Sequence, residues 1–305
     1  MTIHYISYFE KPWRNERNVA EALQWHGYEV ECYQITDPRD RPGQNGAPAI
    51  EQGDIIFTSA PAQLDAADMR RWHDQGAVLA CWYFDWLWGL GNREELYLPR
   101  LKLMDAIFST DGSDNGEHER RGLTCRHWLP QAAMPEDRLL PPRWGTPQHD
   151  VVFMGHIYTD ERREMARRLA ARWDFAHYGG GGDAHRIWGY EMTSICQNAA
   201  IMIGTNYRND VPGYWSDRRY VVMGAGGFYL GQYVAGADAQ FKDGVHCGFY
   251  DGMVDMERKV KWWLEHKAER ERCRRAGWRL VHERHTYTHR VGEMLAVLRR
   301  LGFVK

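Results

Sequence analysis

The residues best suited to bind an anion lie between positions 213 and 230, in the run GYWSDRRYVVMGAGGFYL. Ser216 can cap the start of a helix, Asp217 follows in the first turn, and Arg218 comes next. Free backbone N–H groups at a helix start and a guanidinium group both donate hydrogen bonds to anions such as phosphate. The run therefore predicts a helix that begins with an anion site.

Glycines follow this helix and have two possible roles. Gly224, Gly226 and Gly227 end the predicted helix, and residues 228–230 indicate a short buried strand. Glycine also lets the phosphates of a nucleotide approach the backbone closely. A plain turn and a contact with a nucleotide both remain open interpretations of Gly226 and Gly227.

Strands and helices alternate along both halves of the chain. Short apolar strands followed by helical segments begin at residues 3–8 and restart at 150–154. This alternation predicts an α/β protein with parallel, doubly wound sheets. A length of 305 residues suits two such domains. We place them at 1–140 and 150–285, on either side of a proline-rich linker.

In such sheets, ligands bind beyond the carboxyl ends of the strands. A nucleotide diphosphate needs glycines that let the backbone approach and polar or basic groups that donate to phosphate. Candidates of this kind in the second half, beside those already named, are Gly155, His156, Tyr178, Gly179, Asn206 and Tyr214.

Carboxylates follow two strands of the first half. Asp85 comes after the most buried predicted strand, and Glu10 and Lys11 come after the first strand. A carboxylate in this position can take a proton from an acceptor hydroxyl group. Asp85 is the preferred catalytic base and Glu10 the rival, with a capping role for Asp85 as the structural alternative. Lys11 is assigned to the acceptor side.

Several tryptophans lie among polar or glycine residues, some of them close to these predicted strand ends. Trp13, Trp86 and Trp88 are examples among fourteen tryptophans in the chain. Aromatic rings exposed near turns suit stacking on sugars or bases, whereas buried rings fill a core. We assign these three to the acceptor side and keep core packing as the alternative.

Net charge, cysteine content and apolar runs exclude some classes of protein. A formal net charge of −2 argues against a protein that mainly wraps nucleic acid. Six scattered cysteines without a C-x-x-C pair are typical of a reducing cytosol, and no apolar run is long enough to span a membrane. We expect a cytoplasmic protein.

No metal-binding motif such as D-x-D or H-E-x-x-H occurs in the sequence. We therefore expect that the protein binds no metal ion.

The order of the motifs resembles a known family. The central run continues as GQYVAGADAQFKDGVHCGFYD, and HTYTHR follows at 285–290. Together they resemble the C-terminal half of the CgeB-type, spore-maturation-protein-like glycosyltransferases, over residues 150–295. The resemblance implies a GT-B fold, in which two Rossmann-like domains face each other across a cleft. It also implies a helical C-terminal tail whose last helix, within 286–305, crosses back to the N-terminal domain.

The resemblance also implies an activity. Such an enzyme moves a sugar from a nucleotide diphosphate sugar, with a UDP-sugar favoured, to an acceptor hydroxyl group without a metal or another cofactor. The family resemblance places the donor diphosphate at Ser216 and Arg218. Family members often carry Glu where this chain has Val221. Asp238, or else Asp217, would then bind the ribose; the alternative is that Asp238 caps a helix.

The sequence leaves the chemical identity of the sugar acceptor open. A small molecule, a glycan or a protein is the default, and a 5-hydroxymethyl-pyrimidine base in DNA is a sharper alternative. A third hypothesis, favoured by Val221, is a protein that binds nucleotide sugars without catalysis.

Overall fold

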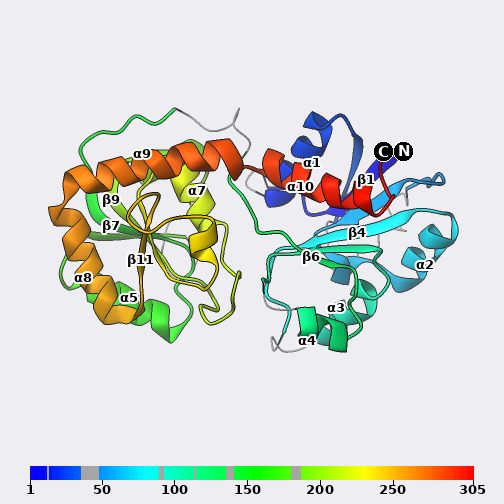
Figure 1. Cartoon of the computed structure of the whole chain (residues 1–305), viewed down its shortest axis with the longest axis horizontal. Coiled ribbons are helices and arrows are strands. Elements are labelled where there is room, and N and C mark those ends of the chain that lie inside the picture. The colour runs from blue at the N-terminus through cyan, green and yellow to red at the C-terminus, as the bar shows by residue number, and fades with distance from the viewer. Residues whose placement is uncertain (12–13, 36–47, 89–92, 113–114, 135–140, 180–186) are drawn as a thin grey trace. The chain divides into compact units, whose positions relative to one another are not determined.

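The computed structural model describes residues 1–11, 14–35, 48–88, 93–112, 115–134, 141–179 and 187–305 (Figure 1). The chain divides into two compact units, which are described separately below. The first unit comprises Met1–Gln131 and Tyr287–Lys305, and the second comprises Ala132–Thr286. The sequence placed the corresponding boundaries at 140, 150 and 285. The last helix belongs to the first unit.

The first unit contains a parallel sheet with the strand order β2-β1-β3-β4-β5-β6. Its central strands are fully buried because their residues are almost all apolar or small. The strands are β1 (Thr2–Ser7), β2 (Glu29–Gln34), β3 (Ile55–Thr58), β4 (Val78–Tyr83), β5 (Ala106–Ser109) and β6 (Arg126–Trp128).

Helices flank this sheet in the intervals between strands. They are α1 (Asn15–Trp25), α2 (Ala66–Asp74), α3 (Arg93–Leu101) and α4 (Asn115–Arg120), joined by the C-terminal α10 (Tyr287–Arg300). Helix α10 packs against α1, and the ring nitrogen Nε2 of His26 lies 2.9 Å from the carbonyl oxygen of Thr288. These contacts attach the end of the chain to the first unit.

The second unit contains a parallel sheet with the strand order β11-β10-β9-β7-β8. The strands are β7 (His149–Met154), β8 (Phe175–Tyr178), β9 (Ala199–Gly204), β10 (Tyr229–Gln232) and β11 (Gly248–Tyr250). The helices are α5 (Asp160–Ala170), α6 (Gly189–Asn198), α7 (Arg218–Gly224), α8 (Gly252–Glu265) and α9 (Lys267–Arg284).

Side chains of β7 alternate between the two faces of this sheet. Val151 and Phe153 pack in the core with α5 and α8, whereas Val152 packs in the core with α6 and α7. Both faces of the sheet are therefore covered, as the apolar strands require. The edge at the carboxyl ends of the strands is where loops can present polar groups.

The strand order defines one special point on that edge. Strand β7 lies between β8, which follows it in sequence, and β9, which comes later. The connections from β7 and from β9 therefore leave in opposite directions, and a crevice forms between the ends of these two strands in doubly wound sheets. The first unit has its equivalent point between β1 and β3.

The strands predicted at 3–8, 150–154 and 228–230 occur as β1, β7 and β10, with boundary shifts of one or two residues. The sequence did not indicate β11, which has only three residues, nor α3 and α4. In the part of the chain that the structure describes, none of the helices combines the length and apolar character needed to cross a membrane.

Candidate functional site at the β7–β9 switch point

Arg218 occupies the switch point of the second sheet. Its Nε donates a hydrogen bond to the carbonyl oxygen of Met154, at the end of β7. Its Nη1 donates to the carbonyl oxygen of Thr205, directly after β9, at 2.9 Å. The guanidinium group therefore lies between the carboxyl ends of the two strands, where a doubly wound sheet binds its ligand.

A second arginine, Arg162, reaches the same place and was missed in the sequence. Its Nη1 donates to the carbonyl oxygen of His156 at 2.8 Å, and its Nη2 donates to that of Thr205 at 3.4 Å. The residue is only 5% exposed. Its Nε is buried and has no hydrogen-bond partner among the described residues.

A signal for Arg162 does exist in the sequence. The buried residues of α5 are Arg162, Met165 and Leu169, which recur at the spacing of one helix face. An arginine on the buried face of an amphipathic helix needs an acceptor at its tip. Thr159 caps this helix by accepting a hydrogen bond from the Arg162 N–H at 3.2 Å, so the arginine lies in the first turn.

The charges of the two arginines are not compensated by carboxylates. Burial, and next the charge of Arg218, lower the pKa of Arg162. Across the described part of the chain, neither guanidinium group has a carboxylate within ion-pair distance. Guanidinium groups stay protonated in proteins, so two positive charges meet here, and their hydrogen-bond partners among the described residues are backbone carbonyl oxygens. Such a site favours a multivalent anion.

Glycines make room beside the arginines. Gly155 has a φ of +149°, and a Cβ atom there would lie 2.5 Å from Nη2 of Arg218. Gly179 has a φ of +132°, and its Cβ atom would lie 2.7 Å from the carbonyl oxygen of Gly155. The backbones after β7 and β8 therefore approach closely, which only glycine permits. Tyr178, half-buried, accepts a hydrogen bond from the Gly155 N–H through its carbonyl oxygen. The three glycines that follow Gly179 in the sequence, at 180–182, lie outside the described residues.

Asn206 and Ser216 hold the loop that leads to α7. The Asn206 Oδ1 accepts from the Ser216 N–H at 3.0 Å, and its Nδ2 donates to Oδ1 of Asn209. The predicted helix start needs a correction, since α7 begins at Arg218 with Asp217 at the capping position. Ser216 instead lies before the helix, where its Oγ accepts from the Arg218 N–H at 3.1 Å. Ser216 and Asn206 thus fix the backbone that carries Arg218.

Three other predicted donor-side residues, His156, Tyr214 and Asp238, differ from one another in exposure and in their contacts. His156 is exposed and uses its carbonyl oxygen to bind Arg162. Tyr214 is buried in the same loop as Ser216. Asp238 is exposed beyond the carboxyl end of β10, where its Oδ1 accepts from the Tyr233 hydroxyl at 3.0 Å. It caps no helix, since the turn at Ala237–Ala239 has Gly236 at its capping position.

Gly226 and Gly227 do not join the other candidates. They precede β10 and therefore lie at the amino end of the parallel strands, whereas Arg218 lies at the carboxyl end. A Cβ atom on Gly226 would lie 2.9 Å from Cβ of Pro142, and one on Gly227 would lie 2.8 Å from Cγ1 of Val222. Gly226 and Gly227 therefore lie at the opposite edge of the sheet from Arg218, which favours the turn interpretation.

In the first unit, the two candidate bases differ in environment. Asp85 is exposed just after β4, where the Phe84 carbonyl oxygen accepts from the Thr110 hydroxyl at 3.1 Å. Partial burial alone would raise the pKa of Glu10. Hydrogen bonds from the backbone and from the Gln34 amide, with the charge of Arg14, hold it below the usual value. A lower pKa makes Glu10 a weaker base.

Of the three tryptophans assigned to the acceptor side, Trp86 and Trp88 fit the core-packing alternative. Trp86 and Trp88 are each 8% exposed. The Trp88 ring packs against His118 and under the Arg121 guanidinium group. A large aromatic side chain gains more from burial than from exposure, so these rings act as packing. Lys11 is exposed, and Trp13 lies outside the described residues.

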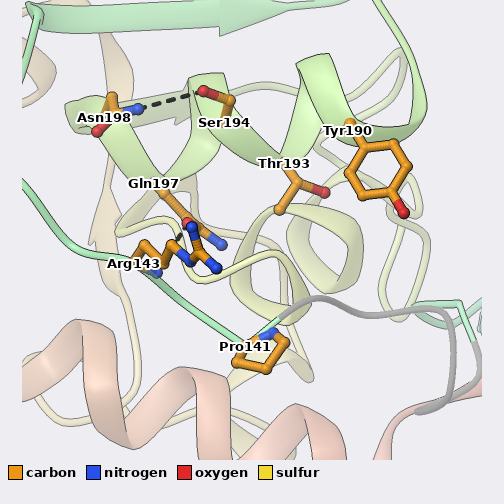
Figure 2. Close-up of a pocket in the computed structure, with 7 residues that line it drawn as sticks. All are labelled: Pro141, Arg143, Tyr190, Thr193, Ser194, Gln197 and Asn198. Carbon is orange, nitrogen blue, oxygen red and sulfur yellow. Dashed lines mark hydrogen bonds between the residues drawn. The ribbon is translucent and has the colours of Figure 1, made fainter.

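A pocket of about 550 Å³ lies elsewhere in the second unit, along α6. Figure 2 shows its lining, in which the side chains of Tyr190, Thr193 and Ser194 come from the helix and Arg143 from the segment beside it. None of the predicted site residues lines it, and Gln197 in its wall is already bonded to Arg143 and Ala225. Among the described residues, no group of three or more His, Cys, Asp or Glu side chains could hold a metal ion.

Comparisons with known proteins bear on this geometry. A family model described as glycosyl transferase-like matches residues 161–296, a little under half of the chain. No curated protein sequence matches. Among solved structures, Anabaena HepE in complex with UDP and glucose is similar with a TM-score of 0.66 and 10% identity, covering 98% of this chain and 99% of that one.

Two further structures are similar over nearly the whole chain. Sucrose-phosphate synthase of Thermosynechococcus elongatus has a TM-score of 0.65 and 14% identity, with 99% of each chain covered. An alpha-glucosyltransferase in complex with UDP and a 13-mer DNA containing an HMU base has a TM-score of 0.63 and 8% identity, covering 97% of this chain and 99% of that one. The predicted fold class is confirmed: the chain has the two-domain GT-B fold with a helical C-terminal region, and its residues 161–296 are similar to glycosyl transferase-like proteins.

Proposed function

We propose that this protein is a glycosyltransferase that takes a sugar from a UDP-sugar and transfers it to an acceptor hydroxyl group. One observation carries the proposal: the uncompensated charges of Arg162 and Arg218 meet at the switch point between β7 and β9. The similarity of residues 161–296 to glycosyl transferase-like proteins supports the reaction class. Structural neighbours in complex with UDP support the choice of nucleotide.

The proposed chemistry follows from the charges. When the bond from the anomeric carbon to the phosphate oxygen breaks, that oxygen gains negative charge. Arg162 and Arg218 stabilise this charge in the partly buried site without a metal ion. Gly155 and Gly179 leave room for the diphosphate to approach the backbone.

Two different carboxylates are proposed to contact the acceptor hydroxyl group and the ribose of the donor. Asp85 takes the proton from the attacking hydroxyl group, because its carboxylate is exposed directly after β4; Glu10, after β1, is the rival base. Asp238 binds the ribose hydroxyl groups, because its carboxylate is exposed at the carboxyl edge and held by the Tyr233 hydroxyl. The chain is proposed to work in the cytoplasm, on a small molecule, a glycan or a protein.

Calorimetric titration tests the nucleotide site. UDP, GDP, TDP, CDP and ADP are each titrated into the full chain, once with EDTA and once with magnesium. We expect UDP to bind most tightly and with the same affinity in both buffers. If none of the five diphosphates binds, the assignment of the site is wrong. If binding requires magnesium, the metal-independent mechanism is wrong.

Turnover separates an enzyme from a binding protein. The chain is incubated with UDP-glucose in the absence of an acceptor, and released UDP is measured over hours. Slow release that disappears in the Arg218→Ala variant supports a working active site. Tight binding of UDP-glucose with no release, and no transfer to any acceptor, would favour the non-catalytic alternative.

A second candidate function is glucosylation of a modified base in DNA. The structural neighbour that binds UDP together with DNA containing an HMU base favours it. Against it stand the net charge of −2 and the burial of Trp86 and Trp88, which leaves neither ring exposed for a flipped base. Transfer from radiolabelled UDP-glucose to a duplex containing 5-hydroxymethyluracil, with an unmodified duplex as control, decides between DNA and other acceptors.

A further inference from the structure

One buried arginine of the second unit has no polar partner. Among the described residues of this unit, four arginines are buried, namely Arg162, Arg219, Arg270 and Arg274. Three of them each donate a hydrogen bond to a backbone carbonyl oxygen. Arg219 differs, because it is only 1% exposed and none of its three guanidinium nitrogens has a hydrogen-bond partner among the described residues. A charge buried in this way needs an explanation.

Aromatic rings surround the Arg219 guanidinium group. Its central carbon lies 4.4 Å from the centre of the Trp215 ring and 5.8 Å from that of Phe249. Both rings belong to the buried core that α6 and α7 form with the sheet. Contacts between a cation and a ring recover part of the free energy that burial of the charge costs, but they supply no counter-charge. No carboxylate of the described residues lies within ion-pair distance of Arg219.

Tyr229 connects this buried charge to the candidate site. Burial raises the pKa of Tyr229, whereas the charges of Arg219 and next of Arg218 lower it, so its hydroxyl group lies in the field of both arginines. A Cβ atom on Gly204 would clash with the Tyr229 hydroxyl. Gly204 directly precedes Thr205, whose carbonyl oxygen accepts a hydrogen bond from Arg218. Arg219 therefore lies beneath the same carboxyl end of the sheet.

We propose that Arg219 supplies a third positive charge to the nucleotide site, and that the bound diphosphate is the counter-charge that the surrounding core does not provide. The inference rests on the proposed function, since it takes a nucleotide diphosphate to bind at Arg162 and Arg218. Arg219 is buried and does not touch the ligand in this proposal. Its charge acts through the protein interior, where the low dielectric constant and the absence of salt leave electrostatic interactions strong.

This role predicts opposite effects of Arg219 on folding and on binding. A buried charge without a counter-charge opposes folding, and an apolar side chain of similar length removes that cost. The same replacement removes a positive charge that attracts the diphosphate. An arginine that served only to pack on Trp215 and Phe249 would behave differently, because its loss would weaken the fold and leave the affinity for UDP unchanged.

The Arg219→Met variant tests the proposal, because methionine keeps an unbranched side chain in the core and carries no charge. Arg274→Met is the matched control. Arg274 is equally buried, but it donates to the carbonyl oxygen of Ala199 at the start of β9, which is the edge of the sheet opposite to Arg218. Thermal unfolding of the full chain without ligand gives the Tm of each variant, and calorimetric titration gives its affinity for UDP.

We expect Arg219→Met to unfold at the Tm of the parent protein or about 2–4 °C above it. It should bind UDP about tenfold more weakly. Arg274→Met should unfold at a lower Tm, because the buried Ala199 carbonyl oxygen loses its donor, and should bind UDP within about twofold of the parent affinity.

Two results would overturn the inference. A Tm of Arg219→Met clearly below that of the parent protein would assign Arg219 to packing, whatever the affinity for UDP. Equal affinities of the parent protein and Arg219→Met for UDP would show that the charge does not reach the ligand, and only this inference would fail. If the parent protein itself binds no UDP, the proposed function fails and this inference fails with it.

Discussion

Arg162 and Arg218 donate hydrogen bonds to the same carbonyl oxygen, that of Thr205, although one lies in the first turn of α5 and the other begins α7. Hydrogen bonds to backbone carbonyl oxygens at and after the end of β7 also hold both side chains in place. For the proposed reaction, such a preorganised pair would need little rearrangement when charge develops on the diphosphate.

Replacement of Arg162 tests the residue that the sequence did not indicate. We expect Arg162→Ala to weaken UDP binding by roughly 10- to 100-fold, because a charge-assisted hydrogen bond to phosphate is lost. Arg167→Ala is the matched control: it removes an equal charge from the exposed side of α5, where Arg167 pairs with Glu164. Calorimetry measures both. Equal affinities in the two variants would remove Arg162 from the site.

Gly155 and Gly226 form a matched pair at opposite ends of the sheet. Both have positive φ angles and crowded surroundings, so alanine at either position should destabilise the fold by about 1–3 kcal/mol. Only Gly155→Ala should also weaken UDP binding, because its new Cβ atom would displace the Arg218 guanidinium group. Chemical denaturation and calorimetry provide the two measurements. Loss of UDP affinity in folded Gly226→Ala would contradict the placement of Gly226 away from the site.

Asp85 and Glu10 are distinguished by their effect on transfer. We expect Asp85→Asn to lower the rate of sugar transfer by about 100-fold or more, since a general base is removed. Glu10→Gln should lower it far less, because both Glu10 carboxylate oxygens already accept hydrogen bonds, from Gln34 and from Arg14. UDP affinity should stay unchanged in both variants. The opposite order of rates would reassign the base to Glu10.

Asp54 should make the stability of the protein depend on pH. It is buried and accepts hydrogen bonds from the Thr2 and Glu51 N–H groups at 2.7 and 2.9 Å, with a His4 ring nitrogen at 3.3 Å. Burial alone would raise the pKa of Asp54, but these contacts hold it below the usual value. The stabilisation is therefore present above the pKa of the unfolded chain, about 3.9, and is lost as the pH falls through the lower folded value.

Asp54→Asn provides the measurement of this effect. At pH 6 we expect the variant to lose about 1–3 kcal/mol in the free energy of unfolding, because the hydrogen bonds of a buried carboxylate are weakened. The difference from the parent protein should shrink toward pH 3. A difference that stays constant between pH 6 and pH 3 would show that the charge of Asp54 plays no part.

Local patterns determined the elements of this protein. The strands predicted at 3–8 and 150–154 occur within one residue of these bounds, because short runs of apolar residues end at polar or glycine neighbours. The alternation of such strands with helices also predicted two parallel sheets. Arg218 was indicated by its neighbours in sequence and by the family resemblance, both of which are visible without a structure.

Only the tertiary structure decided which residues meet. Arg162 joins Arg218 because β7 and β9 are neighbours in the sheet, and this adjacency depends on strand order, which no local pattern encodes. Gly226 follows Arg218 closely in sequence but lies at the other end of the sheet, because α7 runs back along parallel strands. Trp86 and Trp88 are buried, and the Trp88 ring is covered by His118 and Arg121, which are distant from it in sequence. Sequence alone determined which groups could bind a phosphate, and packing between distant segments determined which of them share one site.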